Sequence, residues 1–168
     1  DPVLRDKAIG EAYAYKAFAY FQIVQTYGKR YVAGDANAND GIVLRDDPTE
    51  VTPKERATVA KAYEEIWANL NKAEALLTGK TAANKSHFSL ANVKGIKARV
   101  ALVQQDYAKA AQFAKEARGS SALMSQTQYK AGFNDYSNPE WMWGIKIISD
   151  QTDYFGNFHA YMSRNYNS

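Results

Sequence analysis

The sequence predicts a mainly α fold of antiparallel helical hairpins stacked as an α-α superhelix, followed by a smaller irregular or partly β C-terminal portion. Two observations predict this division. Over residues 1–118, alanine is abundant and large apolar residues recur at steps of three and four, which places them on one face of a helix. In residues 119–168 that period is lost and aromatic residues accumulate. We therefore expect a helical scaffold over 1–118 and an incomplete, partly β lobe over 119–168.

Residues 6–27 are expected to form the first helix, because their apolar side chains keep helical spacing. Asp6 is a suitable N-cap, and Gly28 is expected to end the helix in a left-handed conformation. Residues 31–51 have no period and are rich in turn formers, so they are predicted to be a long loop.

The second helix has two possible starts. Thr52 is followed by Pro53 in a capping-box spacing, and Thr58 is a competing N-cap. Both starts lead to the same helix body, in which apolar residues step by four and three as far as Leu77. Gly79 then marks its end.

Two further helices are expected after Ser89 and after Asp106, the last one ending at Gly119. The tight turn between them, at residues 104–106, makes a helical hairpin. Lys94 and Lys97 are expected on its solvent-exposed face. Beyond the hairpin, a strand is predicted over 141–148, where Trp141, Trp143, Ile145 and Ile147 alternate with Met142, Gly144, Lys146 and Ile148.

The hairpin is similar to the tetratricopeptide pattern, with the small Ala98 where two helices approach and Tyr107 opening the second helix. Gln105 stands where that pattern usually has Gly, and Lys97 replaces a bulky residue. A generic antiparallel hairpin is the alternative.

Composition restricts the class of protein. The chain has 168 residues, 46% hydrophobic and 23% charged, and no cysteine, so disulfide scaffolds, thiolate metal sites and cysteine nucleophiles are excluded. The net charge of +3 arises from interspersed charges, which argues against nucleic-acid binding. No stretch reaches the roughly 18 apolar residues of a membrane-spanning helix. The first residue is not Met, and we expect a segment of a longer parent.

Several segments follow one another in an order that points to a family. They are the helix 10–28, the stretch Gly41-Ile42-Val43-Leu44-Arg45, the helical residues 56–73, the pair 98–111 and the entry 138–143. Together they resemble the SusD/RagB family of outer-membrane nutrient-binding lipoproteins, in which a Pro usually occupies the position of Val43.

The resemblance implies a non-catalytic glycan-binding subunit of a polysaccharide uptake system, with a tetratricopeptide-like scaffold and an irregular lobe that binds an oligo- or polysaccharide. It also implies a SusC-like TonB-dependent transporter as partner. The parent is expected to be a surface-exposed lipoprotein of the outer membrane, its lipid anchor lying outside this chain. No cofactor is expected.

Sugars are bound by aromatic faces that stack on the ring and by polar side chains that bond the hydroxyls. The C-terminal portion supplies both kinds, and the candidates for carbohydrate binding are Trp143, Tyr154, Phe155, Asn157 and His159. For Trp143, packing against the helices is the competing interpretation and the one we favour.

A weak calcium-loop candidate lies in the long loop. Asp35, Asn37, Asn39 and Asp46 occupy positions 1, 3, 5 and 12 of the calcium-loop spacing, where oxygen ligands are needed. Asp40 replaces the usual Gly at position 6, so a flexible polar loop is the favoured alternative.

An enzyme is not expected. The chain has two histidines without metal-ligand spacing, and no pair of carboxylates is placed to act as facing acid and base, as a glycoside hydrolase would require. The alternative to sugar binding is a helical-repeat module that binds protein or peptide without sugar affinity. Exposed C-terminal aromatics favour the first function, and buried aromatics beside an open helical groove favour the second.

Overall fold

The computed structural model describes residues 1–145 apart from 48, 134 and 136, and it confirms a mainly α fold. None of the helices in these residues is long and apolar enough to cross a membrane. The elements, in chain order, are α1 (Pro2–Tyr27), α2 (Val59–Leu77), α3 (Leu90–Val103), α4 (Tyr107–Arg118) and the short α5 (Gln126–Lys130).

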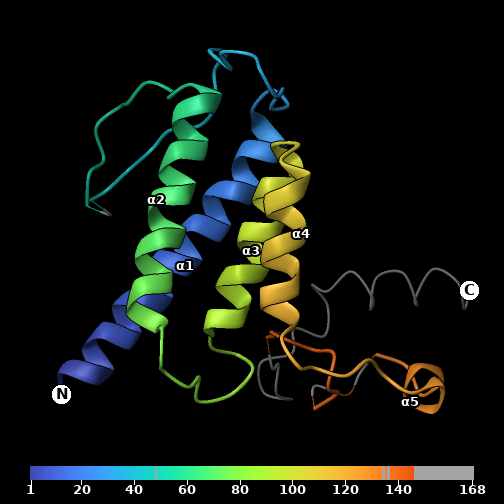
Figure 1. Cartoon of the computed structure of the whole chain (residues 1–168). Coiled ribbons are helices and arrows are strands. Elements are labelled where there is room, and N and C mark those ends of the chain that lie inside the picture. The colour runs from blue at the N-terminus through green and yellow to red at the C-terminus, as the bar shows by residue number, and fades with distance from the viewer. Residues whose placement is uncertain (48, 134, 136, 146–168) are drawn as a thin grey trace, which may run out of the picture.

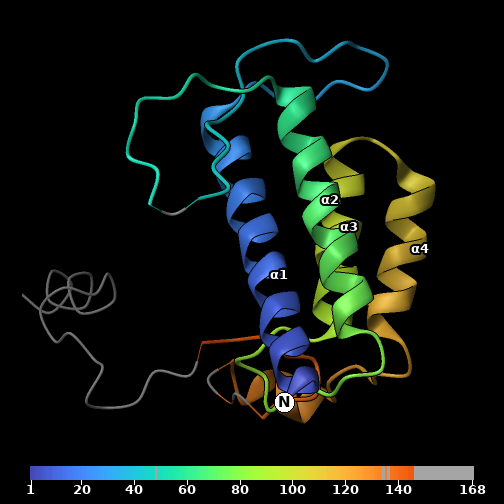
Figure 2. The ribbon, with the colours of Figure 1, turned by 90° about the vertical axis from the view of Figure 1, so that its left-hand side faces the viewer.

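The first four helices form two antiparallel hairpins, α1 with α2 and α3 with α4 (Figure 1). α3 packs against both α1 and α2, and α4 lies on its outer side (Figure 2). One end of the bundle carries the long connection 28–58 and the α3–α4 turn. The connection 78–89 lies at the other end, near α5.

α1 begins earlier than the sequence predicts. Asp1, not Asp6, is its N-cap, since the Asp1 carboxylate accepts a hydrogen bond of 2.8 Å from the backbone N–H of Val3. The helix ends at Gly28 as expected, but Gly28 is extended (φ −92°, ψ 165°) and not left-handed. Glycine is still required there, because a Cβ would lie 2.7 Å from the carbonyl oxygen of Val24.

The structure selects Thr58 as the start of α2. Its hydroxyl accepts from the N–H of Lys61 at 3.2 Å, as an N-cap does. Helix cannot start at Thr52, because the backbone before Thr58 is already paired: the N–H of Gly41 donates to the carbonyl of Ala57 at 2.7 Å. Tertiary hydrogen bonds therefore decide between the two caps.

The long loop is attached to the helices by specific side chains. The Tyr20 hydroxyl accepts from the N–H of Arg45 at 2.9 Å and donates to its carbonyl at 2.7 Å. Arg56 donates from Nε to the carbonyl of Gly41 at 2.8 Å, and Ile42 is buried in the core. The stretch 41–45 is thus the point where the loop closes onto α1.

The expected hairpin of α3 and α4 is confirmed. Ser89 caps α3 with a capping box, and Asp106 caps α4 by accepting from the N–H of Lys109 at 3.1 Å. Gly119 ends α4 with φ +53°. Gln105, in the turn, also has a positive φ, of 65°.

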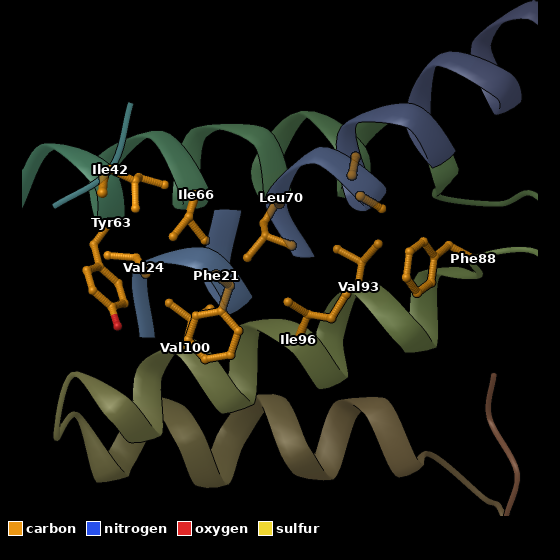
Figure 3. Packing of buried hydrophobic residues seen from close by; sticks show 14 of the residues in the cluster. Phe21, Val24, Ile42, Tyr63, Ile66, Leu70, Phe88, Val93, Ile96 and Val100 are labelled. Carbon is orange, nitrogen blue, oxygen red and sulfur yellow. The ribbon is translucent and has the colours of Figure 1, made fainter. Parts of the chain in front are cut away.

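One apolar core joins the hairpins (Figure 3). Figure 3 shows buried side chains of α1, α2 and α3 that face one another in this core. They include Phe21, Val24, Ile66, Leu70, Val93, Ile96 and Val100.

The expectation that Lys94 and Lys97 face solvent is wrong. Lys97 is only 4% exposed; its Nζ donates to Oδ1 of Asn71 at 2.6 Å and pairs with Glu74. Lys94 pairs with the same Glu74 and, at 2.7 Å, with Glu116. Acidic groups on α2 and α4 therefore draw both lysines into the seam, because a buried ammonium needs a counter-charge.

The predicted strand does not appear in residues 141–145, where the described part of the chain offers no partner strand. Residues 146–148 of that prediction lie outside the described residues. The segment runs instead along the connection 78–89, where the N–H of Gly144 donates to the carbonyl of Lys85 at 3.0 Å.

We expect Glu74→Gln to lower the free energy of unfolding by about 2 kcal/mol at pH 7, since it leaves two lysines without their shared counter-charge. Burial opposes ionisation of Glu74, but Lys94 and Lys97 outweigh it and hold the pKa of its carboxyl below the ordinary 4.5. Its stabilisation is therefore present above pH 4.5 and lost as pH falls through the lowered pKa. Urea unfolding at pH 7 and at pH 3.5 should show a smaller acid effect in the variant.

The matched control is Glu64→Gln, whose pair with Lys61 is well exposed. It should change the free energy of unfolding by less than about 0.5 kcal/mol. Equal effects of the two variants would contradict a structural role for the buried network.

The same substitution should have opposite effects at two helical glycines. In Gly10→Ala the new Cβ would lie 2.9 Å from Cγ of Leu77, so we expect overpacking to lower the free energy of unfolding by about 1 kcal/mol. In Gly95→Ala the nearest atom is 4.0 Å away, and better helix propensity should raise stability by about 0.5–1 kcal/mol. Thermal unfolding of both variants shows whether each substitution raises or lowers the stability. A stabilised Gly10→Ala variant would contradict the close approach of α1 and α2.

Candidate functional site

Trp143 is the only one of the proposed carbohydrate-binding residues within the described part of the chain, and it is half-buried. Its ring stacks on Phe88 with centroids 5.0 Å apart and meets Phe18 edge-on at 5.9 Å. Its indole Nε1 donates to the carbonyl of Ser86 at 3.3 Å. We call Trp143, Phe88, Phe18 and Tyr15 the aromatic anchor; it supports the interpretation that Trp143 packs against the helices.

Neighbouring contacts fix the same segment. Lys85 donates from Nζ to the carbonyl of Ser137 at 3.1 Å and to that of Asn138 at 2.5 Å. Trp141, by contrast, is 37% exposed and has no ring partner among the described residues. The segment 137–144 is therefore held on the connection 78–89 at one end of the bundle. The other candidates, Tyr154, Phe155, Asn157 and His159, lie outside the described residues.

The calcium-loop residues make contacts within the protein. The Asn37 amide donates to the carbonyl of Val32 at 2.9 Å and accepts from its N–H at 2.9 Å. Asp46 pairs with Lys16 at 2.8 Å, a bond that lowers the pKa of the Asp46 carboxyl. The N–H of Asn37 also donates to Asp35 at 2.7 Å. Residues 1–145, apart from the three undescribed positions, contain no group of three His, Asp or Glu side chains suited to a metal.

The network of buried lysines is a feature that sequence reasoning missed. The spacing of Lys94 and Lys97 is compatible with an exposed face, and Glu74 lies 23 residues before Lys97. The available signal was that Lys97 occupies a position where the repeat pattern has a bulky residue. An inward position there demands a counter-charge on a neighbouring helix.

An apolar groove of about 790 Å³ runs along the outer face of the second hairpin. Small and apolar side chains of α3 and α4 make up most of its floor. They include Gly95, Ala98, Leu102, Ala110, Ala111 and Ala114.

Comparisons with known proteins agree with this architecture. A family model described as starch-binding and associating with the outer membrane, SusD-like, matches residues 4–102. The chain is similar to a solved SusD-like carbohydrate-binding protein from Bacteroides vulgatus, at 25% identity and a TM-score of 0.78, covering 90% of this chain and 33% of that one. No curated protein matches.

Two further solved structures share the fold. One, called a putative sugar-binding protein, also from Bacteroides vulgatus, is 21% identical with a TM-score of 0.79, over 95% of this chain and 39% of that chain. The other, a SusD superfamily protein from Bacteroides thetaiotaomicron, is 22% identical with a TM-score of 0.68, over 77% of this chain and 28% of that one. The present chain thus spans between about a quarter and two fifths of the length of these proteins.

We expect Trp143→Ala to lower the free energy of unfolding by about 1–3 kcal/mol, because it removes a half-buried ring from the aromatic anchor. Trp141→Ala removes a ring of the same size without ring partners, and it should cost less than about 1 kcal/mol. Urea unfolding of both variants provides the measurement. If Trp143→Ala were as stable as the wild type, the Trp143 ring would not be what holds the segment 137–144 on the bundle.

Proposed function

The chain belongs to the SusD-like family, whose description is starch-binding and associating with the outer membrane, and from this premise we propose that it is a non-catalytic glycan-binding subunit of an outer-membrane polysaccharide uptake system. The observation that carries the proposal is the family match over residues 4–102, which include α1, the long loop, α2 and most of α3. The likeness to a carbohydrate-binding protein over 90% of this chain supports it.

In the proposed mechanism the helices act as a rigid support for sugar contacts. The aromatic anchor and the bonds of Lys85 attach the segment 137–144 to one end of the bundle. We place the principal sugar contacts further along, at Tyr154, Phe155, Asn157 and His159, with the aromatic faces stacking on sugar rings and the polar groups bonding hydroxyls. Trp143 is assigned a positioning role. Residues 119–168 would then be the start of the ligand-binding lobe.

Binding is the whole of the proposed chemistry. Captured glycan would pass to a SusC-like TonB-dependent transporter, and the parent would reach the surface of the outer membrane as a lipoprotein with its anchor outside this chain. The alternative, a helical-repeat module for protein or peptide, would use the apolar groove of α3 and α4. We do not propose it, because nothing in the described residues shows what covers that groove.

The test is affinity electrophoresis of the chain through native gels that contain a panel of polysaccharides. Retardation by at least one glycan is expected. Tyr154→Ala combined with Phe155→Ala should weaken that binding at least tenfold, which corresponds to a loss of about 1.4 kcal/mol of stacking.

The matched control is Tyr27→Ala, which removes one well-exposed ring from the scaffold. It should migrate as the wild type does. A chain that no glycan retards would contradict sugar binding by these residues. Normal retardation of the Tyr154/Phe155 variant would contradict the residue assignment alone.

A further inference from the structure

A cavity of about 560 Å³ lies at the end of the bundle that carries the long loop, far from the aromatic anchor. We call it the tyrosine cavity. Its wall comes from the end of α1, the first turns of α2, and the turn between α3 and α4, which meet at this end in both views (Figures 1 and 2). The side chains that the argument uses are Lys29, Arg30, Tyr31, Tyr63, Gln105 and Tyr107.

Tyr63 contributes a hydroxyl that has no hydrogen-bond partner among the described residues. The residue is only 3% exposed, and its ring meets Tyr31 edge-on at 5.1 Å. Figure 3 shows the hydroxyl at the end of the ring that points away from Ile42 and Ile66. The hydroxyl oxygen is not among the solvent-excluded polar atoms that lack a partner, so it is reached from the cavity that Tyr63 lines and is free to donate there. A ligand in the cavity can satisfy it.

Burial raises the pKa of the Tyr63 hydroxyl to about 12, so it keeps its proton near neutral pH. It is therefore available as a hydrogen-bond donor over the whole physiological range. An acceptor such as a sugar hydroxyl, a carboxylate or a sulfate oxygen matches that donor.

Gln105 also lines the cavity, and its backbone conformation is unfavourable. Its φ of 65° is one that glycine adopts at lower cost. Its side-chain Oε1 accepts from the N–H of Ala33 at 3.0 Å, which ties the α3–α4 turn to the long loop. The Gln105 side chain is thus held in place beside the long loop, and its amide nitrogen has further donor capacity.

The cavity carries a positive charge. Lys29 and Arg30 line it, no Asp or Glu does, and neither cation has an ion pair among the described residues. The nearby Asp106 caps α4 and pairs with Lys109 at 2.8 Å. Asp40 lines a separate hollow beside Lys29. Two unpaired cations without a competing carboxylate attract an anion.

The rim adds an aromatic surface. Tyr107 is well exposed at the first turn of α4, and Tyr31, which also lines the cavity, is half-buried. Aromatic faces, amide donors and a hydroxyl are the groups that bind a sugar ring. Together with two cations, these groups are complementary to a sugar that also carries a negative charge.

We propose that the tyrosine cavity binds an anionic sugar residue, its ring against the tyrosines and its negative group on Lys29 and Arg30. The negative group is a carboxylate, as in a uronic acid, or a sulfate ester, since both present oxygens to the same cations. The inference rests on the proposed glycan-binding function, and it adds a ligand class and a second site separate from Tyr154 and Phe155.

Isothermal titration calorimetry of the whole chain tests it with three trisaccharides. They are trigalacturonic acid, its methyl ester as the neutral match, and a trigalactose bearing a sulfate ester. We expect at least one anionic probe to bind ten times more tightly than the methyl ester at low salt, and the difference to shrink at 0.5 M NaCl. The probe that binds identifies the source of the charge.

Variants place the binding in the cavity. Lys29→Gln combined with Arg30→Gln should weaken the binding of the anionic probe at least tenfold. Tyr63→Phe, which keeps the ring and removes only the hydroxyl, should weaken it at least threefold. The control Lys115→Gln combined with Lys130→Gln alters two exposed lysines elsewhere and changes the net charge equally. It should leave the affinity unchanged.

Equal binding of charged and neutral probes, or no binding of either anionic probe, would overturn the proposal. An equal loss of affinity in the Lys115/Lys130 control variant would also overturn it, because it would indicate unspecific attraction by net charge. These outcomes are distinct from a failure of the proposed function, because the neutral polysaccharides of the gel panel and the Tyr154/Phe155 variant test sugar binding independently of this cavity.

Discussion

The apolar layer shared by α1, α2 and α3 is the feature on which the rest of the structure depends. Phe21, Leu70 and Val100 come from three different helices and are almost completely excluded from solvent. Helices of this length are marginal by themselves in water, so their stability comes from burying such faces against one another. The close approach of α1 and α2 at Gly10 follows from the same layer.

That layer also determines where the aromatic clusters of the described residues lie. It holds the bundle rigid, and the segments that carry aromatic and polar side chains gather at its two ends. The aromatic anchor lies on the connection 78–89, whereas the tyrosine cavity lies beside the long loop and the α3–α4 turn. α2 spans the distance between these ends, and its 19 residues correspond to about 28 Å.

Local signals were sufficient for most of the helices. Ser89 and Asp106 cap α3 and α4 as the sequence predicts, because a cap involves residues only a few positions apart. The choice between Thr52 and Thr58 could not be made locally, since it depends on hydrogen bonds from residues 37–42. The burial of Lys97 depends in the same way on Glu74, which belongs to another helix.

The sequence by itself determined the helical scaffold, the order of its elements and the resemblance to the family, because helical periods, caps and ordered motifs are written in neighbouring residues. Only the tertiary structure decided that Trp143 packs on Phe88, and that Lys29, Tyr63 and Gln105 surround one cavity. The physical reason is that periodicity defines which face of each helix is apolar. The pairing of those faces is set by side-chain packing between residues far apart in the chain.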